Sequence, residues 1–247
     1  MNQYINLTLD NIEYEHLSCT LENKYQEGIH YKKEWLKKRI PEGHIFRKLD
    51  VDGRVFIEYA PIETAWAPIC GNNYMYIYCL WVSGDYKGYG YGKELLEYAI
   101  EDSKKKGKNG ICAIALKEKK PFLSADGFYK KYGFKVVDTI GDYELLALPF
   151  YDDKLPSFNK NAKAMKINKQ VPTIYYTPLC PFVLNNKMEI ENYAKENQKD
   201  IHFIEIDSLH KAKNAPCVIN NWALFVNGQF VSNTVFFKMI KDVIFDE

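Results

Sequence analysis

The sequence has no C-x-x-C motif, although it contains six cysteines. Their spacing is too scattered for a zinc ribbon. Several of them lie inside apolar runs, where a reduced thiol is usually a core residue. We therefore expect no metal site. The cysteines are Cys19, Cys70, Cys79, Cys112, Cys180 and Cys217.

The sequence also lacks a long apolar segment and an excess of charge of one sign. No uninterrupted apolar stretch approaches the roughly 20 residues of a membrane-spanning helix. The N-terminal MNQYINLTLDN has no basic leader followed by an apolar stretch. Lys and Arg number 33 against 32 Asp and Glu, so the net charge of +1 gives no overall field for nucleic acid or an anionic membrane. These absences predict a soluble cytoplasmic protein that binds neither.

The length of 247 residues and the hydrophobic content of 47% are sufficient for two domains with cores of their own. Residues 151–170 (YDDKLPSFNKNAKAMKINKQ) interrupt the apolar periodicity with Pro, Asn, Asp, Ser and Lys, as linkers do. We therefore expect one domain over residues 1–150, a linker over 151–170 and a smaller domain over 171–247.

Both parts mix helical and strand patterns, which predicts an α+β first domain and a small α/β second domain. Residues 93–106 (KELLEYAIEDSKKK) carry an apolar stripe of helical period. The pair Asn227-Gly228 between two short apolar runs predicts a β-hairpin. Further helices are expected over 11–21, 30–38, 122–131, 184–197 and 235–245, and strands over 4–7, 44–49, 54–60, 75–82, 110–116, 134–137, 143–147, 172–177 and 201–207.

A glycine-rich turn, DYKGYGYG (85–92), joins the strand over 75–82 to the helix over 93–106. Such a turn binds phosphate because glycine lets backbone N–H groups face the anion, to which the helix dipole also contributes. The Walker A pattern is excluded, since Glu94 follows Gly92-Lys93 and position 87 is Lys. The dinucleotide fingerprint G-x-G-x-x-G is excluded because Lys93 stands three residues after Gly90.

The turn resembles the acyl-CoA pyrophosphate loop of the GNAT acetyltransferase family, whose usual form is [QR]-x-x-G-x-[GA]. Lys87, Gly90 and Gly92 occupy the patterned positions, with Lys in place of Gln or Arg. GFYKKYGF (127–134) resembles the later signature of that family, F-Y-x-x-x-G-F. The resemblance implies an acyl-CoA N-acyltransferase fold over residues 1–150 that transfers acetyl from acetyl-CoA directly to a primary amine.

The resemblance also implies which residues bind the coenzyme. Backbone N–H groups near Leu80 to Val82 would form the oxyanion hole for the thioester. Lys87 would add charge to the pyrophosphate loop. An Asn that is common in the family seven residues before Tyr129 is Phe122 here. The implied coenzyme-binding residues are Leu80, Trp81, Val82, Lys87, Gly88, Tyr89, Gly90, Tyr91, Gly92 and Lys93.

Acetyl transfer also needs an acid for the leaving thiolate and a base for the amine, whose pKa is about 10.4. The resemblance makes Tyr129 the predicted acid, with helix packing as its alternative role. Glu63, and less so Glu58, is the predicted base, although either carboxylate alone is more often an exposed surface group. Cys79 as an acyl nucleophile is less favoured than a core thiol.

Residues 175–186 (YYTPLCPFVLNN) resemble the strand–loop–helix entrance of thioredoxin-like folds, with Cys180 and Val183 where C-x-x-C stands. Pro216 precedes a strand and a hairpin, as the cis-proline of that fold does. The whole chain resembles acetyltransferases with a YoaP-like C-terminal region. The alternatives are a thiol-disulfide or thiol-sensing protein acting through Cys180, and a non-catalytic CoA-binding scaffold. The acceptor amine and a possible homodimer are left open.

Overall fold

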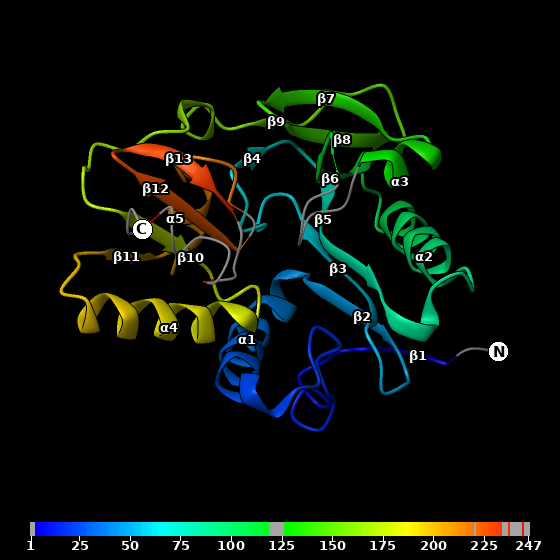
Figure 1. Ribbon diagram of the computed structural model, residues 1–247. Coiled ribbons are helices and arrows are strands. Elements are labelled where there is room, and N and C mark those ends of the chain that lie inside the picture. The colour runs from blue at the N-terminus through cyan, green and yellow to red at the C-terminus, as the bar shows by residue number, and fades with distance from the viewer. Residues whose placement is uncertain (1–2, 119–125, 220, 234–236, 238–243, 245–247) are drawn as a thin grey trace. The chain divides into compact units, whose positions relative to one another are not determined.

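The computed structural model describes residues 3–118, 126–219, 221–233, 237 and 244, which fall into two compact units (Figure 1). The first unit comprises Met1–Leu21, Lys33–Ala65 and Ile69–Phe158. The second comprises Glu22–Lys32, Trp66–Pro68 and Asn159–Glu247. The sequence boundaries placed after residues 150 and 170 stay a prediction. Each helix in the described part of the chain is too short or too polar to cross a membrane.

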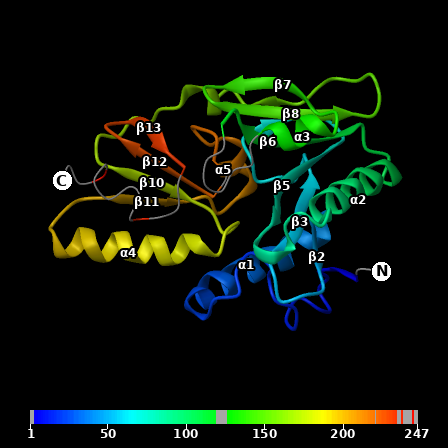
Figure 2. The same cartoon turned by 45° about the vertical axis from the view of Figure 1, so that its right-hand side comes forward.

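The first unit is built on a sheet whose described strands follow the order β1-β2-β3-β5-β6-β8-β7 (Figures 1 and 2). Neighbouring strands are antiparallel except for β5 and β6. Every strand predicted within residues 1–150 is confirmed. The strands are β1 (Tyr4–Asn6), β2 (Ile45–Leu49), β3 (Val55–Pro61), β5 (Tyr74–Val82), β6 (Gly110–Leu116), β7 (Lys135–Ile140) and β8 (Tyr143–Pro149).

Strand β5 changes partners along its length. It pairs in parallel with β6 from Tyr74 to Ile77, and in antiparallel fashion with β3 from Met75 to Val82. The register with β3 shifts so that Tyr59 faces Ile77 and Glu58 faces Cys79. Tyr78 is therefore the extra residue of a β-bulge. Beyond the bulge, the described residues give β5 a partner on the β3 side alone, so its other edge opens where β6 has ended its pairing.

Helix α2 (Tyr91–Lys105) covers one face of this sheet (Figure 2). Leu95, Leu96 and Ala99 are completely buried and form one core with sheet residues from β3, β5, β6 and β8. The predicted helix over 93–106 is thus confirmed. Helix α1 (Gln26–Arg39) confirms and extends the helix predicted over 30–38. Helix α3 (Asp126–Lys131) covers the described part of the helix predicted over 122–131.

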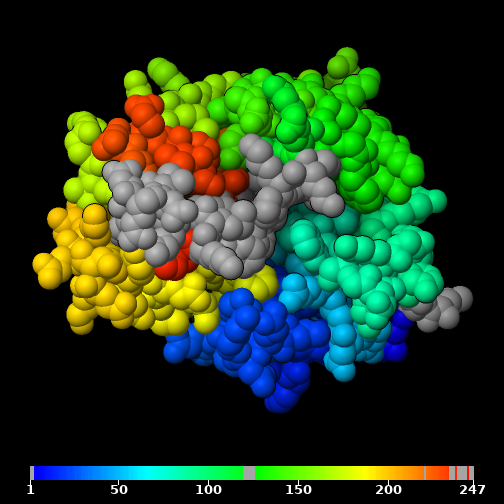
Figure 3. All heavy atoms as spheres, viewed as in Figure 1, coloured from blue at the N-terminus to red at the C-terminus, as the bar shows by residue number. Residues whose placement is uncertain are grey.

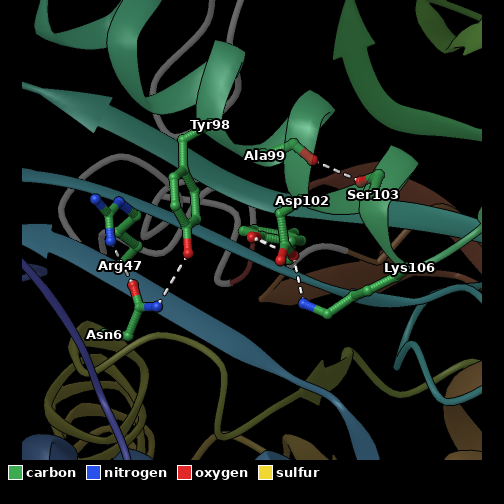
Figure 4. Close-up of polar contacts among 8 residues, drawn as sticks. Asn6, Arg47, Tyr98, Ala99, Asp102, Ser103 and Lys106 are labelled. Carbon is green, nitrogen blue, oxygen red and sulfur yellow. Dashed lines mark hydrogen bonds and ion pairs between the residues drawn. The ribbon is translucent and has the colours of Figure 1, made fainter.

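Polar side chains also connect α2 to the sheet (Figure 4). The Tyr59 hydroxyl donates to the Asp102 carboxylate at 2.8 Å. The Arg47 guanidinium lies 3.7 Å from the centre of the Tyr98 ring, and the Asn6 amide donates to the Tyr98 hydroxyl at 3.1 Å. The first of these contacts is the better shielded, because Tyr59 is fully buried.

We expect Tyr59→Phe to lower the free energy of unfolding by about 1–2 kcal/mol, because Asp102 loses a hydrogen bond from a buried phenol. Tyr98→Phe is the matched control. It removes a hydroxyl from a half-exposed ring and should cost less than about 0.5 kcal/mol. Urea denaturation measures both. Equal losses would show that the Tyr59–Asp102 contact adds no stability of its own.

The helix predicted over residues 11–21 is wrong, because this segment consists of turns. Thr8 N–H donates to the Asn11 side chain at 2.8 Å, and the Asn11 amide donates to Asn6 O at 3.0 Å. These contacts hold a tight turn at residues 8–11, and the chain does not continue from this turn as a helix. Residues 3–44 thus contain one α-helix, α1, in place of the two expected.

Two short strands pair distant parts of the chain. Ile69 of β4 (Ile69–Cys70) faces Phe158 of β9 (Ser157–Phe158), and Cys70 faces Ser157. The sequence patterns did not indicate either strand, since two residues carry no periodicity. The start of the predicted linker therefore lies in the first unit.

The second unit has a smaller sheet, in which the described strands follow the order β11-β10-β12-β13. Strands β10 and β11 are parallel, and β12 is antiparallel to both β10 and β13. Asn227 and Gly228 have φ of 50° and 76°, which confirms the predicted hairpin turn. The elements are β10 (Thr173–Tyr176), α4 (Phe182–Glu196), β11 (His202–Glu205), α5 (Leu209–Lys213), β12 (Trp222–Val226) and β13 (Gln229–Ser232). The helix predicted over 235–245 lies largely outside the described residues.

Candidate active site

The glycine-rich turn forms a loop between the end of β5 and the start of α2. A 3-10 turn over Gly84–Tyr86 comes first, and α2 then begins at Tyr91. Gly84, Gly88 and Gly90 have φ of 61°, 87° and 86°, the left-handed region that glycine alone adopts without strain. A Cβ atom at any of the three would meet no atom within 4 Å. The backbone conformation, and not crowding, therefore requires glycine here.

The first turn of α2 has no side-chain cap. Gly90 is its N-cap residue, so no side chain is available to accept from the first N–H groups. The amides of Tyr91, Gly92 and Lys93 consequently face the loop, where the helix dipole favours an anion. The N–H of Lys87 donates to Gly84 O at 3.2 Å. Because its backbone N–H is already bonded, Lys87 would contact an anion through its exposed ammonium group.

The three tyrosines of this region have different surroundings. The Tyr86 ring covers Gly53, where an added Cβ would lie 2.2 Å from it. Tyr91 is half-buried and packs against the core beneath α2. Tyr89 lies between the two loop glycines and is 72% exposed. The blue-green atoms of this part of the chain lie at the surface in Figure 3. The loop is therefore open to a ligand from solution.

Leu80, Trp81 and Val82 follow the bulge and lie opposite Ile57, Phe56 and Val55 of β3. In an antiparallel pair, successive N–H groups point to opposite edges of a strand. Part of this stretch therefore directs its N–H groups to the edge that β6 does not cover in the described residues. The strand edge beyond the bulge thus leads directly into the glycine-rich loop before α2.

Tyr129 of α3 lies on the α2 side of the sheet and is 3% exposed. Its ring centre is 5.3 Å from that of Phe134 and 5.5 Å from that of Phe128. Burial raises the pKa of the Tyr129 phenol, and the neighbouring Cys79 raises it further. Tyr129 is thus a protonated phenol beside the residue that follows the bulge, although it also packs in the core.

The two predicted base candidates have different environments. Glu63 is exposed, and its carboxylate accepts from Asn73 N–H at 2.6 Å, before the start of β5. Glu58 is buried in β3, opposite Cys79, and lies 2.9 Å from the His44 imidazole. The structure therefore brings Glu58, and not Glu63, to the bulge. The sequence analysis did not identify His44. Glu58, the single carboxylate in the otherwise apolar strand RVFIEYA, could have indicated that a buried partner such as His44 was needed.

In the second unit, Cys180 lies just before α4 and is partly exposed, while Val183 is buried in the first turn. The described residues include no cis peptide bond, so Pro216 does not reproduce the cis-proline expected from the resemblance. Cys217 is fully buried, and burial raises the pKa of its thiol. Cys217 is therefore a core thiol. Phe122, the position of the family Asn, lies outside the described residues.

Two family profiles match this chain. The profile described as the acetyltransferase (GNAT) family covers residues 9–134, and the YoaP-like profile covers residues 200–236. A relative from Bacillus subtilis (strain 168), the uncharacterized N-acetyltransferase YoaP, is 38% identical over 235 residues and spans 94% of each chain. The first match covers the bulge, the loop and Tyr129 together.

Similar solved structures span about three fifths of this chain. The PaiA N-acetyltransferase of Thermoplasma acidophilum, in complex with coenzyme A, is 22% identical with a TM-score of 0.41 over 60% of this chain and 99% of its own. The ribosomal-protein-S18-alanine N-acetyltransferase of Escherichia coli is 17% identical with a TM-score of 0.41 over 62% of this chain and 97% of its own.

Proposed function

This chain belongs to the GNAT acetyltransferase family and is an acetyl-CoA-dependent acyltransferase; from that membership we propose that it transfers acetyl directly to a primary amine. The observation that carries the proposal is the course of β5. It parts from β6 after Ile77 and leads into the glycine loop. The open edge of β5 and the anion-binding loop therefore follow each other along the chain. This order suits a coenzyme whose thioester and pyrophosphate lie at separate points of one extended molecule.

The loop supplies the coenzyme site. The N–H groups at the start of α2 and the Lys87 ammonium hold the pyrophosphate, and the helix dipole adds to the attraction. The open edge after the bulge, from Leu80 to Val82, receives the pantetheine and thioester, with its N–H groups directed at the carbonyl oxygen. Lys93 is exposed and 3.7 Å from Glu97, so its charge is partly offset. The exposed Tyr89 side chain contacts the adenosine part of the coenzyme.

The chemistry proceeds by direct attack of the neutral amine on the thioester carbon. The carbonyl oxygen gains charge that the β5 amides stabilise, and the C–S bond then breaks. Tyr129 donates its proton to the leaving thiolate. Because its pKa is raised above the ordinary value near 10, the phenol carries that proton throughout the neutral range. The base is the remaining requirement, for which Glu63 was the prediction from sequence.

The second unit is proposed to be a thioredoxin-like domain that does no dithiol chemistry. Its strand order, with β10 and β11 parallel and a β12–β13 hairpin, supports this fold. Val183 stands where a resolving cysteine would, so a local disulfide cannot form with Cys180. The family match favours acetyl transfer over the thiol-disulfide and scaffold alternatives.

We expect Cys180→Ser to leave acetyl transfer unchanged, because the proposed reaction has no thiol step. The measurement is the initial rate with the same amine for both proteins. Loss of turnover in the variant would favour the alternative in which the protein acts through the Cys180 thiol. Cys217→Ser is not a suitable control, since it places a hydroxyl in a fully buried site.

The proposed function is tested by following CoA thiol release from acetyl-CoA with a panel of alkylamines. Benzylamine, tyramine, spermidine, lysine and a short peptide with a free N-terminus cover the main acceptor classes. Amine-dependent thiol release, with the acetylated product seen by mass spectrometry, is the expected result. Tight binding of acetyl-CoA with no turnover of any amine would support the scaffold alternative instead.

A further inference from the structure

One buried acid–base pair in the first unit has no part in coenzyme binding. The Nε2 atom of His44 lies 2.9 Å from Oε1 of Glu58, and each side chain is 2% exposed. Neighbouring positions of β3 are buried and apolar. Burying a carboxylate costs several kcal/mol unless a partner compensates it. An apolar residue at position 58 would fill the sheet at lower cost, so stability does not account for the pair.

The pair lies beside the proposed reaction centre. Glu58 is directly opposite Cys79, the residue after the bulge, and opposed residues have Cα atoms about 4.5–5.5 Å apart. Tyr59, the next residue of β3, points to α2, where it binds Asp102. Since successive strand residues point to opposite faces, Glu58 lies on the face away from α2.

Aromatic rings surround the pair on that face. The His44 ring centre is 5.0 Å from that of Trp35 in α1 and 5.1 Å from that of Tyr78, the bulge residue. Tyr78 is in turn 4.9 Å from Tyr76. Rings on two sides keep bulk water from the carboxylate, which strengthens its interaction with a nearby cation. An ammonium group is such a cation.

We propose that the His44–Glu58 pair accepts the proton of the acceptor amine, which deepens the proposed function and rests on it. Before transfer, a carboxylate and a neutral imidazole carry one negative charge together. The ammonium gives one proton to the imidazole, leaving a neutral amine and a carboxylate–imidazolium pair without net charge. The amine lone pair then forms the new C–N bond, the C–S bond breaks, and the proton that the nitrogen still loses replaces the one that Tyr129 gives to the thiolate. Glu58 is the positioning residue, because its carboxylate orients the imidazole and stabilises the imidazolium that forms.

Glu63 is poorly placed for the same role. Its carboxylate is held by the N–H of Asn73, five positions before Tyr78, or about 16 Å of extended strand. An acid at that distance needs a chain of several waters to reach an amine at the bulge, whereas Glu58 needs none or one. The proposal therefore replaces Glu63 with the buried pair.

Glu58→Gln tests the proposal, because it keeps the size of the side chain and removes its charge. With an alkylamine from the panel above that the wild-type protein acetylates, we expect kcat at neutral pH to fall about 10²–10³-fold. The KM for acetyl-CoA should stay within about twofold. The loss should shrink as the pH rises toward 10, because the amine, with a pKa of about 10.4, then sheds its proton without help.

Other titratable groups do not mimic this recovery. Those facing the pair are Tyr78 and Cys79 of β5, while α1 presents Trp35. Beyond them are Tyr76 and Tyr129, whose pKa values burial raises above 10. Tyr78 and Cys79 are the same in both proteins, so the ratio of the two rates reports the loss of the Glu58 charge together with its effect on these two neighbours.

Glu15→Gln is the control, since the Glu15 carboxylate, whose side chain is 26% exposed, lies 2.7 Å from Nζ of the buried Lys48 on β2. It should lower the melting temperature without a pH-dependent loss of kcat. His44→Gln should repeat the Glu58→Gln result and serves if that variant does not fold. A loss that is equal at every pH, or a full rate in Glu58→Gln with a large loss in Glu63→Gln, overturns the proposal. A wild-type protein that acetylates no amine overturns the proposed function itself, and the inference with it.

Discussion

Gly90→Val is expected to raise the KM for acetyl-CoA by about tenfold or more. Valine at φ of 86° costs well over 1 kcal/mol, because its branched side chain crowds the backbone in the left-handed region. In the variant, the loop can relieve this strain if residue 90 changes to negative φ. That change would turn the first N–H groups of α2 away from the anion. Each 1.4 kcal/mol of lost interaction weakens binding tenfold. Initial rates at varied acetyl-CoA concentration, together with calorimetric titration of CoA, measure the effect.

Gly107→Val is the matched control for this substitution. Gly107 follows the other end of α2 with φ of 64°, and a Cβ there also meets no atom within 4 Å. It should lower the melting temperature while the KM for acetyl-CoA stays unchanged. If Gly90→Val bound CoA as the wild type does, the amides at the start of α2 would not be the pyrophosphate site.

Tyr129→Phe is expected to lower kcat about 10²-fold with little change in the KM for acetyl-CoA. The phenol proton is lost while the ring keeps its packing against Phe128 and Phe134. Burial raises the folded-state pKa of Tyr129 well above its ordinary value near 10, so the phenol keeps its proton through pH 10 and loses it only above that raised pKa. The wild-type rate should therefore show no loss of this acid anywhere below pH 10. Steady-state kinetics at several pH values measure both features.

Tyr132→Phe provides the comparison for Tyr129. Tyr132 follows α3, and its half-buried ring lies 5.2 Å from Phe128, so the substitution removes a hydroxyl from the same aromatic cluster. It should leave kcat unchanged. If Tyr129→Phe retained the full kcat and lost only stability, the packing role would be the whole role of Tyr129.

The sequence predicted the conformation of the glycine loop better than the surroundings of the bulge. The loop is local: its glycines, the preceding strand and the following helix lie within about 30 residues, so spacing alone separates it from nucleotide-binding loops. The pair of His44 and Glu58 depends on which residues of β2 and β3 face each other. The bulge at Tyr78 then decides which β5 residues lie beside them. A one-residue shift in pairing moves side chains to the other face, and no periodicity in the sequence fixes that shift.

Two other differences have similar causes. The apolar residues over 11–21 suggested a helix, but after the turn that Thr8 and Asn11 hold the segment continues as turns and irregular chain. The β4–β9 pair joins Ile69 to Phe158 across most of the first unit, and two-residue strands give no pattern to detect. Local patterns predicted the long elements, and contacts between distant residues decided the rest.

Because the start of α2 has no side-chain cap, the proposed coenzyme would itself accept hydrogen bonds from the first N–H groups of the helix. A helix that begins at a glycine gives up roughly a few tenths of a kcal/mol relative to one with a side-chain cap. In the proposed complex, a bound pyrophosphate supplies the missing acceptor, so coenzyme occupancy and the integrity of the first turn become one equilibrium. Amide hydrogens of Tyr91 to Lys93 should exchange with deuterium quickly in the free protein and slowly with CoA present, which would make this turn an internal sensor of saturation.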